Sequence, residues 1–356
     1  MDAKHPQTPE LKAENHTPAT VAPGFVAGLL SALPEHGIDP AKVLAEAGLD
    51  PDVLIGDSRR VLLTDYALLY NRVVALLQDE GFGLFSVKLN VGTFEFLCRS
   101  MIGSRTLAEA LTHAGKFLRL VLPDLTLSAV VDDKTARIEI REVIPIGKGP
   151  DDPRRVFAFE WLLRLVHGLA CWLAARGLSL DSVQFPYAPP PQAADYTLIY
   201  TEHASFGGER LIAHLRPNLF ALPIRRDQDD LARFLDGAPG KITMLYRRDR
   251  EMVRQIRDIL AASMPEALSI EDIADRLHVS LRTVQRRLKE EGSSYRAIKS
   301  ALRRDIALSK IEKSKKSVGE IANELGYAET SAFFRAFVDW TGETPTSYRR
   351  RMRSLS

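Results

Sequence analysis

The chain has 356 residues, of which 45% are hydrophobic and 26% are charged, an ordinary globular composition whose length suits two domains. Its net charge of +2 hides an asymmetry: residues 241–356 carry 24 Lys and Arg against 16 Asp and Glu, a net of +8, while the first 240 residues carry 24 against 30, a net of −6. We therefore expect the C-terminal part to bind a polyanion and the N-terminal part not to.

Two cysteines, Cys98 and Cys171, are far apart in the sequence, which excludes a zinc cage, a CxxC pair and a dense disulfide framework. We expect both to be buried small hydrophobic side chains in a protein of the reducing cytoplasm. Residues 1–20 are polar and contain no apolar signal sequence. The most apolar segment, 161–175, is interrupted by an arginine and a histidine and is expected to be too short to span a bilayer, so no membrane partner is predicted.

The N-terminal region combines helical and extended patterns. Residues 1–19 have few large apolar groups and are predicted to be a disordered tail. Apolar residues at helical spacing predict helices within 21–33, 40–47, 64–78, 106–121, 153–176 and 193–203. Alternating apolar residues predict a hairpin over 125–141, and shorter extended segments are predicted at 183–185, 210–215 and 219–223. We therefore expect residues 20–224 to form an α+β domain.

Two groups of side chains in this domain are candidates for binding a small molecule. Trp161, Arg164 and His167 lie on the long predicted helix and could line a pocket, with an ordinary amphipathic helix as the alternative. Arg99 and Arg119 could bind an anionic ligand, with a solvated surface charge as the alternative for each. Residues 225–246, charged and interrupted by glycine and proline, are predicted to be a linker.

Residues 247–356 are predicted to form an all-α domain with two helix-turn-helix units. The first unit, about 268–290, has a capped first helix, a tight turn and a second helix that Ser280 caps. The apolar residues of this second helix face inward, so Arg282, Gln285 and Arg286 point outward. Arginine reads guanine and glutamine reads adenine in the major groove, and we expect these three side chains to contact bases.

The second unit, about 317–341, repeats the pattern. Ser317 and a glutamate three residues later form a capping box before the first helix. Thr330, Ser331 and Arg335 lie on the outer face of the second helix. We expect Thr330 and Arg335 to contact bases. We expect Ser331, and Ser280 in the first unit, to contact the DNA backbone.

A continuous helix over 294–313 is predicted between the units. Twenty residues at about 1.5 Å each span about 30 Å, close to the roughly 34 Å between successive major grooves on one face of DNA. Such a spacer would let both recognition helices dock on that face. Arg296, Lys299 and Arg303 lie along it and are expected to contact the DNA backbone.

The C-terminal sequence, over about its last 100 residues, closely resembles AraC/XylS-type transcription regulators. The resemblance rests on residues that agree with the family in type, order and spacing: Ile321, Ala322, Gly326, Tyr327, Ser331, Phe333, Arg335, Phe337, Gly342, Pro345, Tyr348 and Arg349. Tyr327 is a departure, because phenylalanine is commoner there. The N-terminal half resembles, more loosely, the arabinose-binding-type effector domain through Asp65-Tyr66 and residues 104–111. The resemblance implies a one-component regulator whose N-terminal domain binds a small molecule.

The sequence thus predicts a transcription regulator that binds double-stranded promoter DNA. RNA polymerase and a second copy of the chain are further candidate partners. No catalytic residue, cofactor or metal site is predicted, because no phosphate-binding loop, dinucleotide fingerprint, serine elbow or HExxH motif occurs. The alternative is an enzyme or metabolite-binding protein that its C-terminal domain tethers to DNA.

Overall fold

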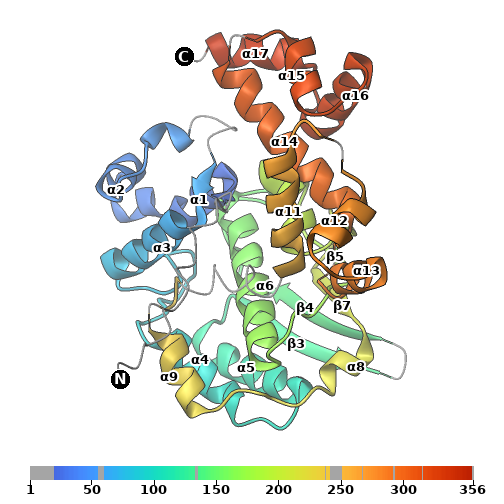
Figure 1. Ribbon diagram of the computed structural model, residues 1–356. Helices are drawn as coiled ribbons and strands as arrows, with labels where there is room; N and C mark the ends of the chain where they lie inside the picture. The colour runs from blue at the N-terminus through green and yellow to red at the C-terminus, as the bar shows by residue number, and fades with distance from the viewer. Residues whose placement is uncertain are drawn as a thin grey trace, which may run out of the picture.

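The computed structural model describes residues 20–54, 60–132, 135–236, 238–240, 251–266, 268–291, 293–314 and 316–354. The predicted tail and most of the second half of the predicted linker lie outside these residues. Figure 1 shows a mixed α and β N-terminal part and a C-terminal part of helices alone. The predicted fold class is therefore confirmed.

The N-terminal part is built around a five-stranded sheet of order β3-β4-β7-β5-β6. Its pairs are antiparallel except β5 with β6, which is parallel. The predicted hairpin is its first pair, with Leu127 opposite Ile140 and both side chains buried. The strands are β3 Leu125–Val131, β4 Ala136–Glu142, β5 Ser182–Gln184, β6 Ala204–Ser205 and β7 Leu211–Leu215, and a separate two-stranded sheet pairs β1 Thr20–Val21 with β2 Val61–Leu62.

Helices cover this sheet and extend its core (Figure 1). They are α1 Pro23–Leu30, α2 Pro40–Glu46, α3 Leu63–Leu77, α4 Thr93–Ile102, α5 Leu107–Val121, α6 Pro153–Leu173, α7 Tyr196–Ile199, α8 Pro217–Phe220 and α9 Gln228–Leu235, with 3-10 turns η1 Leu33–His36, η2 Pro51–Leu54 and η3 Pro191–Asp195. The helix predicted over 193–203 is shorter, because η3 occupies its start. The extended segment predicted over 219–223 begins inside α8, where Pro217 at the first position favours a helical turn.

Helix α6 is the central element of the N-terminal core. It has 21 residues, with Asp152 capping its start and Pro153 at its first position. By length and composition it could cross a membrane, so the expectation of too short a segment was wrong. Its apolar window is nevertheless entirely buried inside the protein, as for the core helix of a soluble protein.

The predicted linker contains a helix that belongs to the N-terminal core. In α9, Phe234 is buried and stacks on Trp172, with ring centroids 4.4 Å apart. The Phe234 ring also lies 5.9 Å from that of Phe94 on α4. Helix α9, although it lies within the predicted linker, therefore packs into the N-terminal core.

The C-terminal part holds seven described helices: α11 Glu251–Ser263, α12 Ile270–Arg276, α13 Leu281–Glu290, α14 Tyr295–Lys313, α15 Val318–Glu324, α16 Thr330–Thr341 and α17 Pro345–Ser354. They enclose two separate apolar cores. Helix α14 serves both: Ile298 and Leu302 belong to the first core, Ala307 and Ile311 to the second. Its 19 residues give a length of about 28 Å, which confirms the predicted connecting helix.

Candidate DNA interface and effector core

The first helix-turn-helix unit consists of α12 and α13. Ser269 caps α12 through a capping box, and the Ser280 hydroxyl accepts a hydrogen bond from the Thr283 amide at 3.1 Å at the start of α13. Val284 and Leu288 of α13 are buried in the first core. These local bonds and this apolar stripe fix which face of α13 looks outward.

The second unit consists of α15 and α16 and follows the same plan. The Ser317 hydroxyl accepts a hydrogen bond from the Glu320 amide at 3.2 Å, and the Glu320 carboxylate accepts one from the Ser317 amide at 2.7 Å. The hydrogen bonds from Ser317 lower the pKa of Glu320, so the box is formed with an ionised carboxylate at neutral pH. Phe333 and Phe337 are fully buried in the second core.

The predicted DNA-reading side chains are exposed in both units. On α13 they follow the cap, and on α16 they occupy the first two turns. The exposed residues are Ser280, Arg282, Gln285, Arg286, Arg296, Thr330, Ser331 and Arg335. The Ser331 hydroxyl donates to the Glu329 carboxylate at 3.1 Å. The first face carries two arginines and the second carries one, so the two faces differ in charge.

Two residues predicted to contact the DNA backbone instead bond within the protein. Lys299 Nζ donates to the Leu268 carbonyl at 3.1 Å, and Arg303 Nη2 donates to the Gly326 carbonyl at 2.9 Å. The Arg303 guanidinium also lies over the Tyr327 ring, 4.5 Å from its centroid. These bonds fasten α14 to the beginning of the first unit and to the turn of the second, and the phosphate contacts of both residues stay a prediction.

The two turns use different residues in the same backbone conformation. His278 and Gly326 both have a left-handed φ, 53° and 71°. A Cβ on Gly326 would lie 2.6 Å from the Pro265 carbonyl oxygen. The left-handed φ and this short distance both favour glycine at position 326.

We expect Gly326→Ala to lower the free energy of unfolding of the C-terminal part by about 1–2 kcal/mol or more, because alanine adds left-handed strain to that contact. His278→Gly should change it by less than about 1 kcal/mol, since relief of strain is offset by the greater entropy of unfolded glycine. Chemical denaturation of both variants checks the pair. A larger effect at residue 278 than at residue 326 would contradict this account.

The five predicted effector residues are not brought together in one site. Arg99 and Arg119 are exposed, and Arg99 forms an ion pair with Glu95 on the surface of α4. Trp161, Arg164 and His167 are all buried in α6. Their partners are core groups: Trp161 Nε1 donates to the Tyr70 hydroxyl at 3.0 Å, Arg164 lies over the Phe25 ring, and His167 Nε2 lies 2.6 Å from the Leu178 carbonyl oxygen.

A buried carboxylate that sequence reasoning missed lies beside them. Glu160 is 1% exposed, and its Oε1 accepts hydrogen bonds from the Gln192 amide at 2.8 Å and from the Tyr196 hydroxyl. The Tyr200 hydroxyl donates to the Glu160 backbone carbonyl at 3.0 Å. Burial, the largest influence, raises the pKa of Glu160 to about 7, although Tyr196, Arg164 and Gln192 each favour its ionised form. We call Glu160, Gln192, Tyr196 and Tyr200 the Glu160 cluster.

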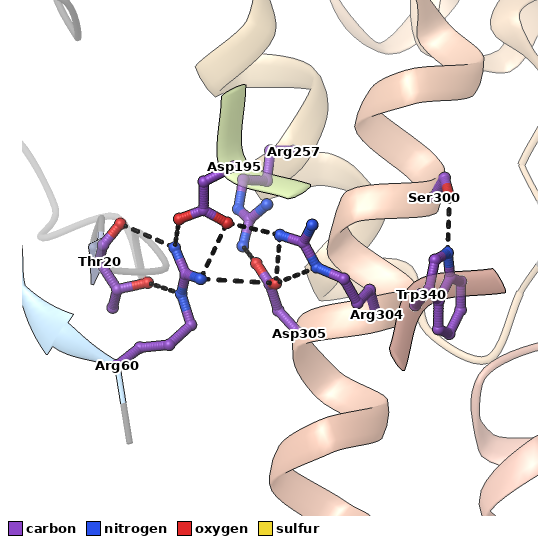
Figure 2. A network of polar contacts seen from close by, with 8 residues as sticks. All are labelled: Thr20, Arg60, Asp195, Arg257, Ser300, Arg304, Asp305 and Trp340. Atoms are coloured by element: carbon purple, nitrogen blue, oxygen red, sulfur yellow. Dashed lines mark hydrogen bonds and ion pairs between the residues drawn. The ribbon is translucent and has the colours of Figure 1, made fainter. Parts of the chain in front are cut away.

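An ion cluster joins the two domains (Figure 2). Asp195 of the N-terminal domain pairs with Arg304 of α14 at 2.6 Å and with Arg60 at 2.7 Å. Asp305, next along α14, pairs with Arg257 of α11 at 2.7 Å and with Arg304 at 3.1 Å, and lies 3.9 Å from Arg60. We call these five residues the interdomain ion cluster.

The cluster is held as charged groups despite its burial. Burial alone would raise the pKa of Asp305, but the three arginines outweigh it and lower that pKa. Asp195, Arg304 and Asp305 have side chains 5%, 7% and 8% exposed, so removing one partner would leave a buried charge uncompensated.

A hydrogen bond and a pocket also lie where the two helix-turn-helix units meet the N-terminal domain. The Ser179 hydroxyl donates to the Lys289 carbonyl near the end of α13 at 2.7 Å. A pocket of about 580 Å³ is lined by residues of both domains, among them Gln192 and Asp195 of the N-terminal domain and Arg304, Trp340 and Tyr348 of the C-terminal domain. The side chains predicted to contact bases are exposed on α13 and α16, so the interface leaves them accessible.

A sequence signal for the interdomain ion cluster did exist. Arg304 follows Ala301 by three residues and precedes Ala307 by three, so it lies within the buried stripe of α14. A charged residue on such a stripe indicates a buried ion pair. Its partner, Asp195, is 109 positions away, and nothing local identifies it.

Comparison with known proteins agrees with this architecture. Residues 37–224 match the family described as the arabinose-binding domain of AraC transcription regulators, and residues 273–351 match a helix-turn-helix domain family. The chain belongs to the AraC family of transcription regulators. It is thus a DNA-binding regulator with an N-terminal ligand-binding domain.

Relatives of this AraC-family chain share its full extent or its C-terminal part. An ornithine utilization regulator from Pseudomonas aeruginosa is 27% identical over 94% of this chain and 98% of its own length. The regulator VqsM of the same organism is 37% identical over 27% of this chain and 30% of its own. The crystal structure of the regulator CdpR, also from Pseudomonas aeruginosa, is 21% identical, covers 92% of this chain and 98% of its own, and has a TM-score of 0.29.

Proposed function

We propose that α13 and α16 read two successive major grooves on one face of promoter DNA. Arg282, Gln285 and Arg286 contact bases from α13, and Thr330 and Arg335 contact bases from α16. The observation that carries this proposal is that both sets are exposed while one helix, α14, belongs to the cores of both units. Its length of about 28 Å suits the roughly 34 Å repeat of the duplex. Ser280, Arg296 and Ser331 contact the backbone in this arrangement, and Lys299 and Arg303 do not.

Selection of bound duplexes from a random library by the full chain tests this proposal. The expected result is a pair of short motifs whose centres lie about one helical turn, roughly 10 base pairs, apart. Footprinting on the selected duplex should protect both motifs from the same face. Recovery of a single motif, or of no preferred sequence, would defeat the two-groove arrangement.

The N-terminal domain, in this proposal, binds a small molecule without converting it. A thermal-shift screen of the full chain with amino acids, amines, organic acids and fatty acids tests for the ligand, and a saturable rise in the melting temperature identifies its class. Ornithine belongs in the first set, because a relative covering the whole chain is named an ornithine utilization regulator. We further propose that the protein acts in the cytoplasm, with RNA polymerase and a second copy of the chain as partners.

We expect Arg296→Gln to weaken binding to selected and random duplexes alike. One lost phosphate contact should flatten the slope of log K against log salt by about one unit. Arg303→Gln should leave the slope unchanged, because its guanidinium bonds to Gly326 inside the protein. Arg99→Gln, which removes an exposed arginine from the N-terminal domain, controls for net charge. Equal slopes in all three variants would remove Arg296 from the interface.

A further inference from the structure

One short segment of the N-terminal domain contacts both the Glu160 cluster and α14. It consists of η3 and α7, residues 191–199, followed directly by Tyr200. Three of its side chains bond to Glu160: Gln192 and Tyr196 to the carboxylate, Tyr200 to the backbone carbonyl. Glu160 lies on α6, so these bonds anchor the segment to the central helix of the domain.

The same segment presents Asp195 to the other domain. Asp195 immediately precedes Tyr196, and its carboxylate bonds to Arg304 on α14 and to Arg60 (Figure 2). Two consecutive residues therefore bond in two directions, one to α6 and one to the helix that joins both reading units. Because these side chains share one short stretch of backbone, a shift of Tyr196 displaces Asp195.

One oxygen of the Glu160 carboxylate takes no part in these bonds. Its Oε1 accepts two hydrogen bonds, whereas its buried Oε2 has no hydrogen-bond partner among the residues that the structure describes. A donor group brought to Oε2 would compete for the carboxylate's charge and weaken its bonds to Gln192 and Tyr196. Glu160 Oε2 is thus the atom at which a bound donor could change the hydrogen bonds of the Glu160 cluster.

We propose that η3 and α7 relay the state of the N-terminal core to the DNA-binding domain, with the bonds of Glu160 at one end and the Asp195–Arg304 ion pair at the other. Loosening the Glu160 end releases Asp195 and frees α14, which changes how the two reading units are held relative to the N-terminal domain. The inference deepens the proposed regulation and rests on it for its biological meaning. The coupling between the Glu160 cluster and α14 needs neither DNA nor ligand, so it can be tested on the chain without them.

Hydrogen–deuterium exchange on the full chain, without DNA or ligand, tests the relay. Asp195→Asn keeps the size of the side chain and removes the ion pair, and should speed exchange in α14 around Arg304 about fivefold or more. Tyr196→Phe keeps the buried ring and removes the hydroxyl, which bonds to Glu160 and lies 3.1 Å from the Tyr187 hydroxyl, and should speed exchange in the same part of α14. By reciprocity, Arg304→Gln should speed exchange in residues 191–200.

Glu139→Gln is the matched control. Glu139 is also a carboxylate buried in the N-terminal domain, but it pairs with Arg137 and Arg141 on the sheet. This variant should affect exchange in β4 and β7 and leave α14 unchanged. The inference is overturned if Tyr196→Phe leaves α14 unchanged while Asp195→Asn affects it, or if Glu139→Gln loosens α14 equally.

A second measurement separates this inference from the DNA-binding proposal. On duplexes obtained by selection, Tyr196→Phe should change affinity severalfold while the preferred sequence stays the same, because the reading side chains are untouched. Failure of the selection would remove the proposed DNA contacts but leave the exchange result standing. If the selection yields a preferred sequence but Tyr196→Phe and Asp195→Asn leave exchange in α14 as it is in the unmodified chain, the relay is wrong and the proposed DNA contacts stand.

Discussion

Replacing both Arg282 and Arg286 by alanine should cost about 2–6 kcal/mol in binding to the selected duplex, since each bidentate pair with a base supplies about 1–3 kcal/mol of discrimination. The two side chains are exposed and four residues apart, hence on the same face of α13. Their loss should erase preference within the first motif and leave preference within the second. Competition binding with duplexes altered in one motif at a time measures both.

The control for this double variant is the pair Arg99→Ala and Arg119→Ala. It removes the same charge from two exposed arginines on helices of the N-terminal domain. We expect it to leave the preference within both motifs intact. If the α13 double variant still distinguishes intact from altered first motifs, α13 is not a reading helix.

Phe337→Ala is expected to destabilise the second unit by about 3–5 kcal/mol, the usual cost of removing a buried aromatic ring. Phe337 is fully buried, and its ring packs edge to face against Phe333 and Tyr348 at 5.7 and 5.5 Å. Among the residues that the structure describes, the core that it serves has eight buried members, so little else would hold α16 in place. Protection of the second motif in a footprint should disappear, whereas the first motif, read from a separate core, stays protected.

Val338→Ala provides the comparison at the next position of the same helix. Val338 is 38% exposed, so its truncation should leave the melting temperature and the footprint near those of the unmodified chain. Loss of protection over both motifs in Phe337→Ala would show that the two cores do not fold independently. An unchanged footprint would mean that α16 contributes no contact.

The elements that could be predicted are those that local chemistry determines. Ser269, Ser280 and Ser317 each cap the helix that follows them, and the alternation over β3 and β4 identifies the hairpin. The start of α6 was predicted correctly at Pro153, whereas its end lies at Leu173, three residues before the predicted end. A helix buried on every side has no polar face, so periodicity does not mark where it ends.

The function of a charged side chain on a helix was harder to predict than its position. Lys299 and Arg303 lie on a basic face of α14, and that pattern fits phosphates as well as carbonyl groups. Their partners, Leu268 and Gly326, belong to other elements and become neighbours only after folding. The bonds from Gln192 and Tyr196 to Glu160 span more than thirty positions and have no sequence signature.

The two reading faces carry different side chains: Arg282, Gln285 and Arg286 on one, Thr330 and Arg335 on the other. With the proposed contacts, a single bound chain therefore has one orientation along the duplex, and its operator is not palindromic. An inverted operator would present the wrong half to each helix and would point the N-terminal domain toward the other neighbouring gene. The protein would then distinguish operators by their orientation as well as by their base sequence.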